Sequence, residues 1–393
     1  MNTPTARGIF LVTVILLGLG VVMVTGTSST VSRERYGSEW ELLHNHLAFM
    51  AVGLVVFVAC WACPTRVARR VSLPMLVLGF LLCVAVFTPL GREAGGARRW
   101  LRAGPLSVQP MEVLKLGLVM WAASFLSRRP GVAAEFPAGL LPVGAVTLAA
   151  MALVMLQPDY SSALIIGGVA IAVVYVAGAK LWHLALVVAP AIPAAVMLAV
   201  LEPYRAKRLT AFWRPWETAA NEGYQTIQSM VSFASGGLVG VGLGSSRQKL
   251  LFLPESHTDF VFSIVGEELG LIGAACVVLL FACLVVFGMK ASRSAESPFA
   301  SYLAAGLVAM LGMQAALHMG VVVGLVPPTG VTLPFLSYGG SSMVFSLAAC
   351  GLLLRVAGTA APVGVGSRAR EQRPARQAHL RLRQTRLDGS WSV

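Results

Sequence analysis

The sequence contains few charged residues, and their scarcity excludes most classes of soluble protein. Only 12% of the 393 residues are Asp, Glu, Lys or Arg, whereas 56% are hydrophobic. A soluble domain carries about 25% charged residues. The hydrophobic residues also gather in long blocks, and a block of roughly 20 apolar residues can cross a bilayer as a helix. The composition therefore predicts a polytopic membrane protein.

Several motifs of soluble enzymes are also absent. The sequence has no P-loop, no soluble nucleotide-binding domain and no zinc signature, so we expect no nucleotide cofactor. All six cysteines lie in apolar runs, and the CxxC pair of Cys60 and Cys63 has no second pair beside it. We interpret these cysteines as small apolar residues of membrane spans. No convincing repeat is present, which gives no support to a transporter built from inverted repeats.

The apolar blocks predict an all-α fold with ten membrane-spanning helices. The approximate bounds of these spans are 9–25, 47–63, 72–90, 112–127, 138–156, 160–178, 183–201, 260–288, 300–325 and 338–357. The first block has nine more behind it and no clear cleavage site, so we interpret it as a span rather than a signal peptide. A long outer loop separates spans seven and eight, and its Gly-rich part, 227–244, is expected to form a short helix and loop that either lie in the outer interface or re-enter the bundle.

The two ends of the chain differ in composition. Residues 1–358 form the predicted ten-span domain, and residues 359–393 form a basic tail that we expect to be disordered, cytoplasmic and able to contact anionic lipid. An even number of spans places both termini on one side of the membrane. Lys and Arg residues gather on that side, at Arg7, Arg66, Arg69, Arg70, Arg128, Arg129, Lys180, Lys290, Arg293 and Arg355. The positive-inside rule predicts that this side is cytoplasmic.

The net charge of +13 is also carried by loops on the opposite side, against that rule. These outer residues are Arg92, Arg98, Arg99, Arg102, Arg205, Lys207, Arg208, Arg214, Arg247 and Lys249. An anionic ligand outside would offset their charge, because Arg forks match the geometry of phosphate. Alternatively, they are solvated arginines beside lipid headgroups. In either case we expect membrane lipids, and no nucleic acid, as their partners.

The most informative segment, PESHTDFVFSIVGEELG, begins at Pro254. His257 and Asp259 stand at the mouth of an apolar run, whereas Glu267 and Glu268 lie inside it. A carboxylate at membrane depth is costly and normally marks function. If a helix begins near residue 258, Glu267 lies about 12 Å deeper than Asp259. Asp259 is then placed to act as a general base on a hydroxyl group, or to cap the helix. The two glutamates are expected to be partners of buried donors.

Two clusters accompany the predicted fourth and sixth spans. Glu112 and Lys115, in QPMEVLKL, are three residues apart and share a helix face. Lys115 either contacts a phosphate with Glu112 orienting it, or the two residues satisfy each other as an ion pair. In the tight turn QPDY, Asp159 either contributes to a site or caps span six.

The last cluster, PPTGVTLPFLSYGGSS, precedes the tenth span, and its Pro and Gly residues break helix. Broken backbone at membrane depth is tolerated where it lines a cavity, to which Ser337 and Ser341 add hydroxyl groups. All of these clusters lie on the predicted outer side. Together they predict a site open to the outside and to the outer leaflet.

These motifs resemble the shape, elongation, division and sporulation (SEDS) family of bacterial cell-wall polymerases. The resemblance covers about Gly91 to Arg355 and is carried by GARRWL, QPMEVLKL, QPDYSS, GAKLW, YRAKRLTAFWRPWE, GYQTIQS, GLGSSRQKLLFLPESHTDFVFSIVGEELG and TGVTLPFLSYGGSS. AFWRPWE and GEELG resemble the division branch more than the elongation branch, and the sporulation branch is also close. Met111 and Ser107 depart from the family pattern, which usually has Ser or Ala at the first position and in some members Arg at the second.

The resemblance implies a multi-pass glycosyltransferase of the bacterial cytoplasmic membrane, acting at the division septum. Its substrate would be lipid II, a disaccharide-pentapeptide on undecaprenyl pyrophosphate, which it would polymerise into peptidoglycan with inversion at the anomeric carbon. The family's essential aspartate falls on Asp259, its functional Glu and Lys on Glu112 and Lys115, and the Arg of its RW motif on Arg99. A class B penicillin-binding protein and other divisome proteins are the implied partners.

On this interpretation Asp259 is the catalytic base. The expected substrate-binding residues are Arg99, Glu112, Lys115, Arg208, His257, Ser337 and Ser341. Arg99, Lys115 and Arg208 would neutralise the leaving pyrophosphate. A divalent cation, Mg²⁺ or Mn²⁺, could share that task, although no ligand set is evident. The alternatives are a lipid II flippase, the elongation or sporulation paralogue, and a non-catalytic scaffold that recruits the transpeptidase.

Overall fold

The computed structural model describes residues 3–94, 97–103, 106–129, 131–201, 203–221 and 223–359. Within these residues the long helices are α1 (Pro4–Tyr36), α2 (Glu41–Ala62), α3 (Thr65–Ala85), α4 (Pro110–Leu126), α5 (Leu141–Met155), α6 (Tyr160–Val176), α7 (Leu181–Leu201), α8 (Pro203–Trp213), α9 (Tyr224–Gly236), α10 (Val261–Arg293), α11 (Pro298–Val322) and α12 (Gly340–Thr359). The predicted disordered tail lies outside the described residues, apart from Thr359, which ends α12.

The prediction of a polytopic helical membrane protein is confirmed. Among the described residues, seven helices are long and apolar enough to cross a membrane: Pro4–Glu34, Glu41–Ala62, Thr65–Ala85, Phe136–Met155, Val261–Arg293, Pro298–Val322 and Gly340–Thr359. Tyr160–Val176 and Leu181–Ala191 are shorter apolar helices. The exact number of ten spans stays a prediction, because α4, α6 and the apolar part of α7 are short.

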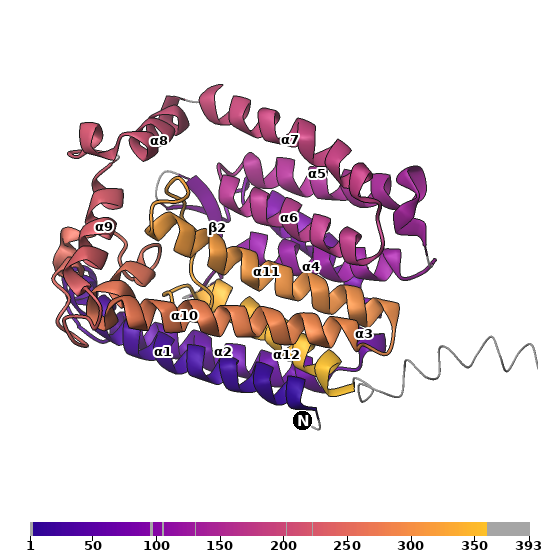
Figure 1. The fold of residues 1–393 in the computed structure, drawn as a ribbon, viewed down its shortest axis with the longest axis horizontal. Helices are drawn as coiled ribbons and strands as arrows, with labels where there is room; N and C mark the ends of the chain where they lie inside the picture. The colour runs from indigo at the N-terminus through magenta and orange to yellow at the C-terminus, as the bar shows by residue number, and fades with distance from the viewer. Residues whose placement is uncertain are drawn as a thin grey trace, which may run out of the picture.

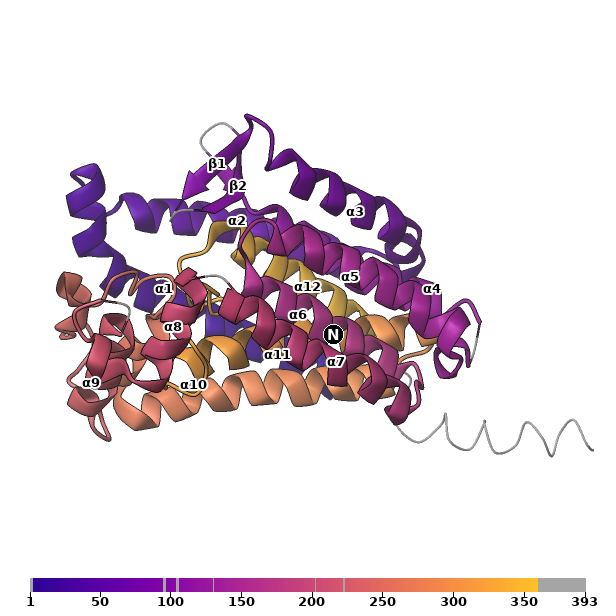
Figure 2. The ribbon, with the colours of Figure 1, turned by 90° about the horizontal axis from the view of Figure 1, so that it is seen from above.

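The helices form a bundle in which α4 is an inner helix. Figure 2 shows α3 and α10 on opposite sides, with α4, α6 and α11 between them. All but two residues of α4, Trp121 and Phe125, are buried. A helix that is enclosed by protein can carry ionisable side chains that lipid would penalise. This enclosure explains how α4 accommodates Glu112 and Lys115.

A small β-sheet connects α3 to α4, where only a loop was expected. The strands β1 (Gly91–Ala94), β2 (Ala97–Ala103) and β3 (Leu106–Val108) form an antiparallel sheet in the order β1-β2-β3. Arg92 pairs with Trp100, and Arg102 pairs with Ser107. The all-α prediction therefore holds for the bundle but was wrong for this connection. The strands are short, and β1 and β2 are rich in arginine, so they lack the hydrophobic alternation that normally predicts a sheet.

The long loop between α7 and α10 is largely helical. It contains α8, α9 and two short turns, η3 (Pro215–Thr218) and η4 (Gln248–Phe252). The short helix expected within 227–244 corresponds in part to α9, and its position relative to the membrane stays a prediction. Figure 1 shows α8, α9 and the sheet gathered at one end of the bundle, and the start of α1 and the end of α12 toward the other.

A break in α10 fixes the loop to the bundle. Gly270 has a φ of 66°, which is a left-handed conformation that favours glycine. At this point the backbone N–H groups of Val241 and Gly242 donate to the carbonyls of Glu267 and Glu268, at 3.0 and 3.1 Å. The first turns of α10 are thereby held by the loop that precedes them, and with them the turn that carries Asp259.

Candidate functional site

Asp259 lies in a tight turn just before α10. The N–H groups of Thr258 and Asp259 donate to the carbonyl of Glu255, at 3.1 and 3.0 Å, and Glu255 itself has a left-handed φ of 52°. Phe260 is the N-cap of α10, and no side chain caps this helix. The alternative that Asp259 is a helix cap is therefore wrong. Its carboxylate points instead towards the loop between α11 and α12, where a Cβ at Gly330 would lie 3.3 Å from Oδ2.

The surroundings of Asp259 suit proton transfer near neutral pH. Burial raises the pKa of Asp259 from 3.8 to about 7, and the negative charge of Glu255 adds to this rise. A hydrogen bond from Thr258 and the positive charges of Arg208 and Arg99 oppose the rise in pKa. A general base works best when its pKa lies near the working pH. The two predicted arginines therefore share a neighbourhood with the predicted base.

Arg99 joins the sheet to the bundle. Its Nε donates to the carbonyl of Gln157 at 3.1 Å, and its Nη2 donates to the carbonyl of Pro158. Gln157 in turn donates to the carbonyl of Cys83 at 2.9 Å, so the turn between α5 and α6 is tied to the end of α3. In that turn Asp159 accepts a hydrogen bond from the N–H of Ser162 at 3.2 Å, which confirms its interpretation as the cap of α6.

Arg208 reaches the site from α8. Its Nη1 donates to the carbonyl of Pro328 at 3.4 Å, in the loop between α11 and α12. This loop also contains Gly330, which packs beside the Asp259 carboxylate. Arg208 and Asp259 thus face the same short stretch of backbone from different parts of the long loop.

His257 and Ser337 hold the two loops of the site together. The N–H of Tyr338 donates to the carbonyl of His257 at 2.9 Å, and Ser337 Oγ donates to the carbonyl of Thr258 at 2.6 Å. Ser337 Oγ also accepts from the N–H of Leu333 at 2.8 Å. The Ser337 hydroxyl thus donates one structural hydrogen bond and accepts another. A direct contact of Ser337 or His257 with a substrate stays a prediction.

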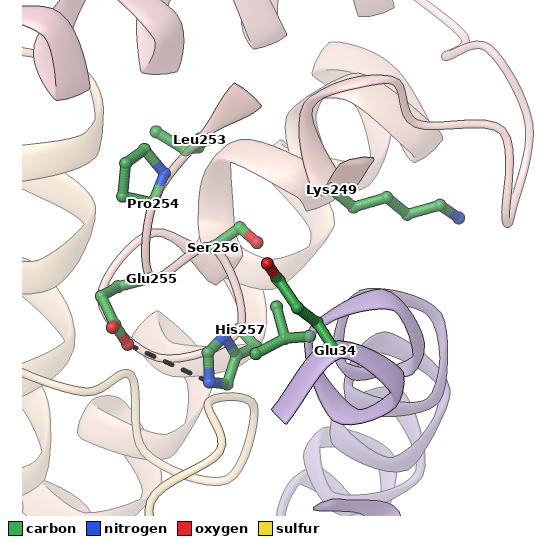
Figure 3. Close-up of a pocket in the computed structure, with 8 residues that line it drawn as sticks. Glu34, Lys249, Leu253, Pro254, Glu255, Ser256 and His257 are labelled. Atoms are coloured by element: carbon green, nitrogen blue, oxygen red, sulfur yellow. Dashed lines mark ion pairs between the residues drawn. The ribbon is translucent and has the colours of Figure 1, made fainter. Parts of the chain in front are cut away.

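A pocket of about 200 Å³ lies on the α1 side of this turn. It is lined by Val31, Glu34, Lys249, Leu253, Pro254, Glu255, Ser256 and His257. Figure 3 shows Glu34 beside the turn of Ser256 and His257, and His257 Nε2 is 4.0 Å from Glu255 Oε2. Asp259 is not among the lining residues, so this pocket adjoins the site without containing the base.

Glu112 and Lys115 form a buried ion pair within the bundle. Lys115 Nζ is 2.9 Å from Glu112 Oε2, and the Lys115 side chain is only 1% exposed. Lys115 Nζ also donates to Gln314 Oε1 at 2.7 Å. Gln314 Nε2 then donates to Ser342 Oγ at 3.0 Å and to the carbonyl of Thr332 at 3.1 Å. The two residues therefore satisfy each other as an ion pair, which was the second of the two alternatives drawn from the sequence.

Ser341 connects the start of α12 to the start of α4. Its Oγ accepts from the N–H of Gln109 at 3.0 Å and donates to the carbonyl of Ser107 at 3.3 Å. The loop between α11 and α12, with the first turn of α12, thus contacts the surroundings of Asp259, Arg208 and Lys115. Predicted site residues reach this loop from α8, from the turn before α10 and, through Gln314, from α4.

Glu267 and Glu268 support the loop, as expected. Glu267 accepts from Ser246 Oγ and, at 2.9 Å, from the N–H of Arg247. Glu268 forms an ion pair with Lys249 at 3.2 Å. Both carboxylates therefore hold the polar segment after the Gly-rich stretch against α10.

Sequence reasoning missed Gln314, which links Lys115 to the loop before α12. It is a lone amide in an apolar span, and such a residue indicates a buried polar contact. The structure also bears on the divalent cation considered above. In the part of the chain that the structure describes, no three His, Cys, Asp or Glu residues are grouped so that they could hold a metal ion. A divalent cation therefore stays a prediction, and we derive no step through one.

Comparison with known proteins agrees with this arrangement. The family of FtsW, RodA and SpoVE, described as "Cell cycle protein", matches residues 7–361. A probable peptidoglycan glycosyltransferase FtsW from Saccharophagus degradans is 40% identical over 87% of this chain and 89% of its own. Stage V sporulation protein E from Bacillus subtilis is 36% identical over 88% of this chain and 95% of its own.

A solved structure has the same fold. It concerns the structural coordination of polymerization and crosslinking by a peptidoglycan synthase complex. One chain of that complex superimposes with a TM-score of 0.73 and 29% identity, covering 91% of this chain and 98% of its own. The likeness therefore extends over the whole bundle and not only over the motifs.

Proposed function

Because the chain belongs to the FtsW, RodA and SpoVE family of cell cycle proteins, we propose that it is a peptidoglycan glycosyltransferase that polymerises lipid II during cell division. The observation that carries this proposal is the position of Asp259. Burial raises the pKa of this carboxyl to about 7, and the charges of Arg208 and Arg99 act on it. Such a site can remove a proton from a hydroxyl nucleophile beside groups that attract phosphate.

The proposed topology has ten spans. Adding α4, α6 and α7 to the seven long apolar helices gives this number, and it places α8 and α9 in a long outer loop. Both termini then lie in the cytoplasm, in keeping with the positive-inside rule. Asp259, Arg99 and Arg208 lie at the outer face of the bacterial cytoplasmic membrane, where lipid II is polymerised at the septum.

The proposed reaction is an inverting displacement. The GlcNAc 4-hydroxyl of one lipid II attacks the anomeric carbon of the growing chain, and its proton passes to Asp259. The bond between that carbon and the pyrophosphate oxygen breaks, and undecaprenyl pyrophosphate leaves with the electron pair. Arg99 and Arg208 neutralise the developing negative charge. The α-linked donor thereby becomes a β-linked polymer.

The other predicted residues act in this proposal as positioning residues. Glu112 and Lys115 fix the start of α4 against α11 through Gln314. His257, Ser337 and Ser341 hold the loops that surround Asp259. A substrate phosphate would reach Lys115 only if the buried pair opened, because the Lys115 side chain is 1% exposed.

The proposed partner is a class B penicillin-binding protein, a crosslinking transpeptidase, with other divisome proteins around it. The similar solved chain belongs to a peptidoglycan synthase complex in which polymerization and crosslinking are coordinated. Pairing the two activities would deliver the new glycan strand directly to the enzyme that crosslinks it. The wild-type chain purified with such a partner is the appropriate preparation for assays.

A liposome assay tests the proposed activity against lipid II transport. Wild-type protein is reconstituted with lipid II, and glycan polymer and transbilayer movement of lipid II are measured in the same vesicles. We expect β-linked polymer that lysozyme digests, without faster movement of the lipid. Movement without polymer would refute the glycosyltransferase and favour the flippase.

A further inference from the structure

A second pocket lies at the end of the bundle far from Asp259, between the start of α3 and the end of α4. Its volume is about 470 Å³, which is in the range of small-molecule sites. It is lined by Arg66, Arg69, Arg70, Ser72, Leu73, Pro74, Ser124 and Arg128. α3 ends near the β-sheet that carries Arg99 and begins at this pocket, so the pocket and the catalytic end are separated by the length of α3, about 30 Å.

The pocket concentrates positive charge. Its four arginines are all exposed, and among the described residues none of them forms an ion pair with a carboxylate. Three of them stand in the first two turns of α3, which has no acidic residue in its first turn. The N-terminus of a helix is the positive end of its dipole, so cations there are unfavourable and an anion is favoured. The arrangement therefore calls for an anionic occupant.

The outer face of α3 continues from the pocket as an apolar stripe. Leu73, Val77, Leu81 and Val84 are all about half exposed or more. Their spacing of four, four and three residues places them on one face of the helix. A ligand held by the arginines would thus have an apolar surface beside it that points away from the bundle. This combination of phosphate-matching forks and an adjoining apolar stripe fits a phospholipid better than a free ion.

We propose that this pocket binds the headgroup phosphate of an anionic phospholipid, with the acyl chains lying along the Leu73–Val84 face of α3. Arg66, Arg69 and Arg70 reach the phosphate from α3, and Arg128 reaches it from the end of α4. The lipid would join the ends of two helices whose opposite ends flank the β-sheet. The topology proposed above places this site in the cytoplasmic leaflet, although the binding itself depends only on the pocket.

Lipid retention measured by native mass spectrometry tests the proposal. The full chain is purified from nanodiscs that contain phosphatidylcholine and phosphatidylglycerol. The fraction of protein that keeps phosphatidylglycerol is compared between wild type, R66Q/R69Q/R70Q and the control R129Q/K180Q/R293Q. The control removes the same charge from residues that do not line the pocket. Each basic residue near anionic lipid contributes roughly fivefold in affinity, about 1 kcal/mol.

We expect the pocket variant to weaken phosphatidylglycerol retention at least tenfold, and the control variant to stay within about twofold of wild type. Arg128→Gln, on a different helix, should weaken retention about fivefold, and it serves if the triple variant does not fold. Equal losses in the pocket and control variants would overturn the proposal. It would also be overturned if the wild-type protein bound inorganic phosphate but retained phosphatidylglycerol no better than phosphatidylcholine.

Discussion

Replacing Lys115 by methionine should destabilise the protein strongly, because it leaves Glu112 as an unpaired buried charge. The two side chains are 1% and 4% exposed, and their charged atoms are 2.9 Å apart. Removing one partner of a buried ion pair costs about 3–5 kcal/mol. With an unfolding entropy of about 2.1 cal/mol/K per residue, a chain of this length loses roughly 1.2 °C in Tm per kcal/mol. The expected decrease in Tm is therefore about 4–6 °C for Lys115→Met.

The double variant E112L/K115M separates stability from function. Replacing both charges by apolar groups of similar volume is often neutral, so its Tm should return to within about 2 °C of wild type. Thermal unfolding in detergent, followed by tryptophan fluorescence, measures both variants. If polymerisation is also restored in the double variant, the pair has a positioning role alone. The reasoning is refuted if Lys115→Met has the same Tm as wild type, because an unpaired buried Glu112 should lower the Tm.

Three further outcomes follow from the turn before α10 and the break in that helix. Because burial raises the pKa of Asp259 to about 7, the rate of polymerisation should increase as pH rises through 7. In pH–rate profiles, Arg208→Gln should shift the midpoint upward and Glu255→Gln should shift it downward, because Arg208 lowers the pKa of Asp259 and Glu255 raises it. Ionisation of Asp259 destabilises the folded state, so Asp259→Asn should have a higher Tm than wild type at pH 8. This difference in Tm should shrink as pH falls from 7 to 4, and a difference that does not depend on pH would contradict the assignment. Gly270→Ala should lower Tm and speed proteolysis of the 236–249 loop, because the left-handed φ and the nearby backbone of Leu238 and Gly240 leave no room for a Cβ.

Much of the site could be predicted because its residues break local rules in the sequence. Asp259 stands at the mouth of an apolar run, and Glu267 and Glu268 stand within one, so their cost in a membrane marks them. The sequence could not decide between a helix cap and a free carboxylate at Asp259. That choice depends on the left-handed turn at Glu255, which brings Phe260 rather than Asp259 to the cap position.

Other features depend on contacts between distant segments. Gln314 becomes part of the site only because α11 packs against α4, 199 residues away along the chain at Lys115. The sheet of β1, β2 and β3 is held to the bundle by Arg99, which donates to the turn between α5 and α6, and hydrophobic periodicity does not reveal such a contact. The number of spans was hard to predict because α4 is enclosed by other helices and needs no continuous apolar face.

Polymerisation of lipid II by the purified chain and its transpeptidase partner, with Asp259 as wild type, Asn or Glu, tests the central claim most directly. A general base contributes about 10²–10⁴-fold to the rate, so Asp259→Asn should lower polymer formation at least about 100-fold while the fold and the complex persist. Asp259→Glu keeps the carboxylate and should retain more activity than Asn. Polymer formation by the Asn variant within tenfold of wild type would contradict the assignment of Asp259 as the base.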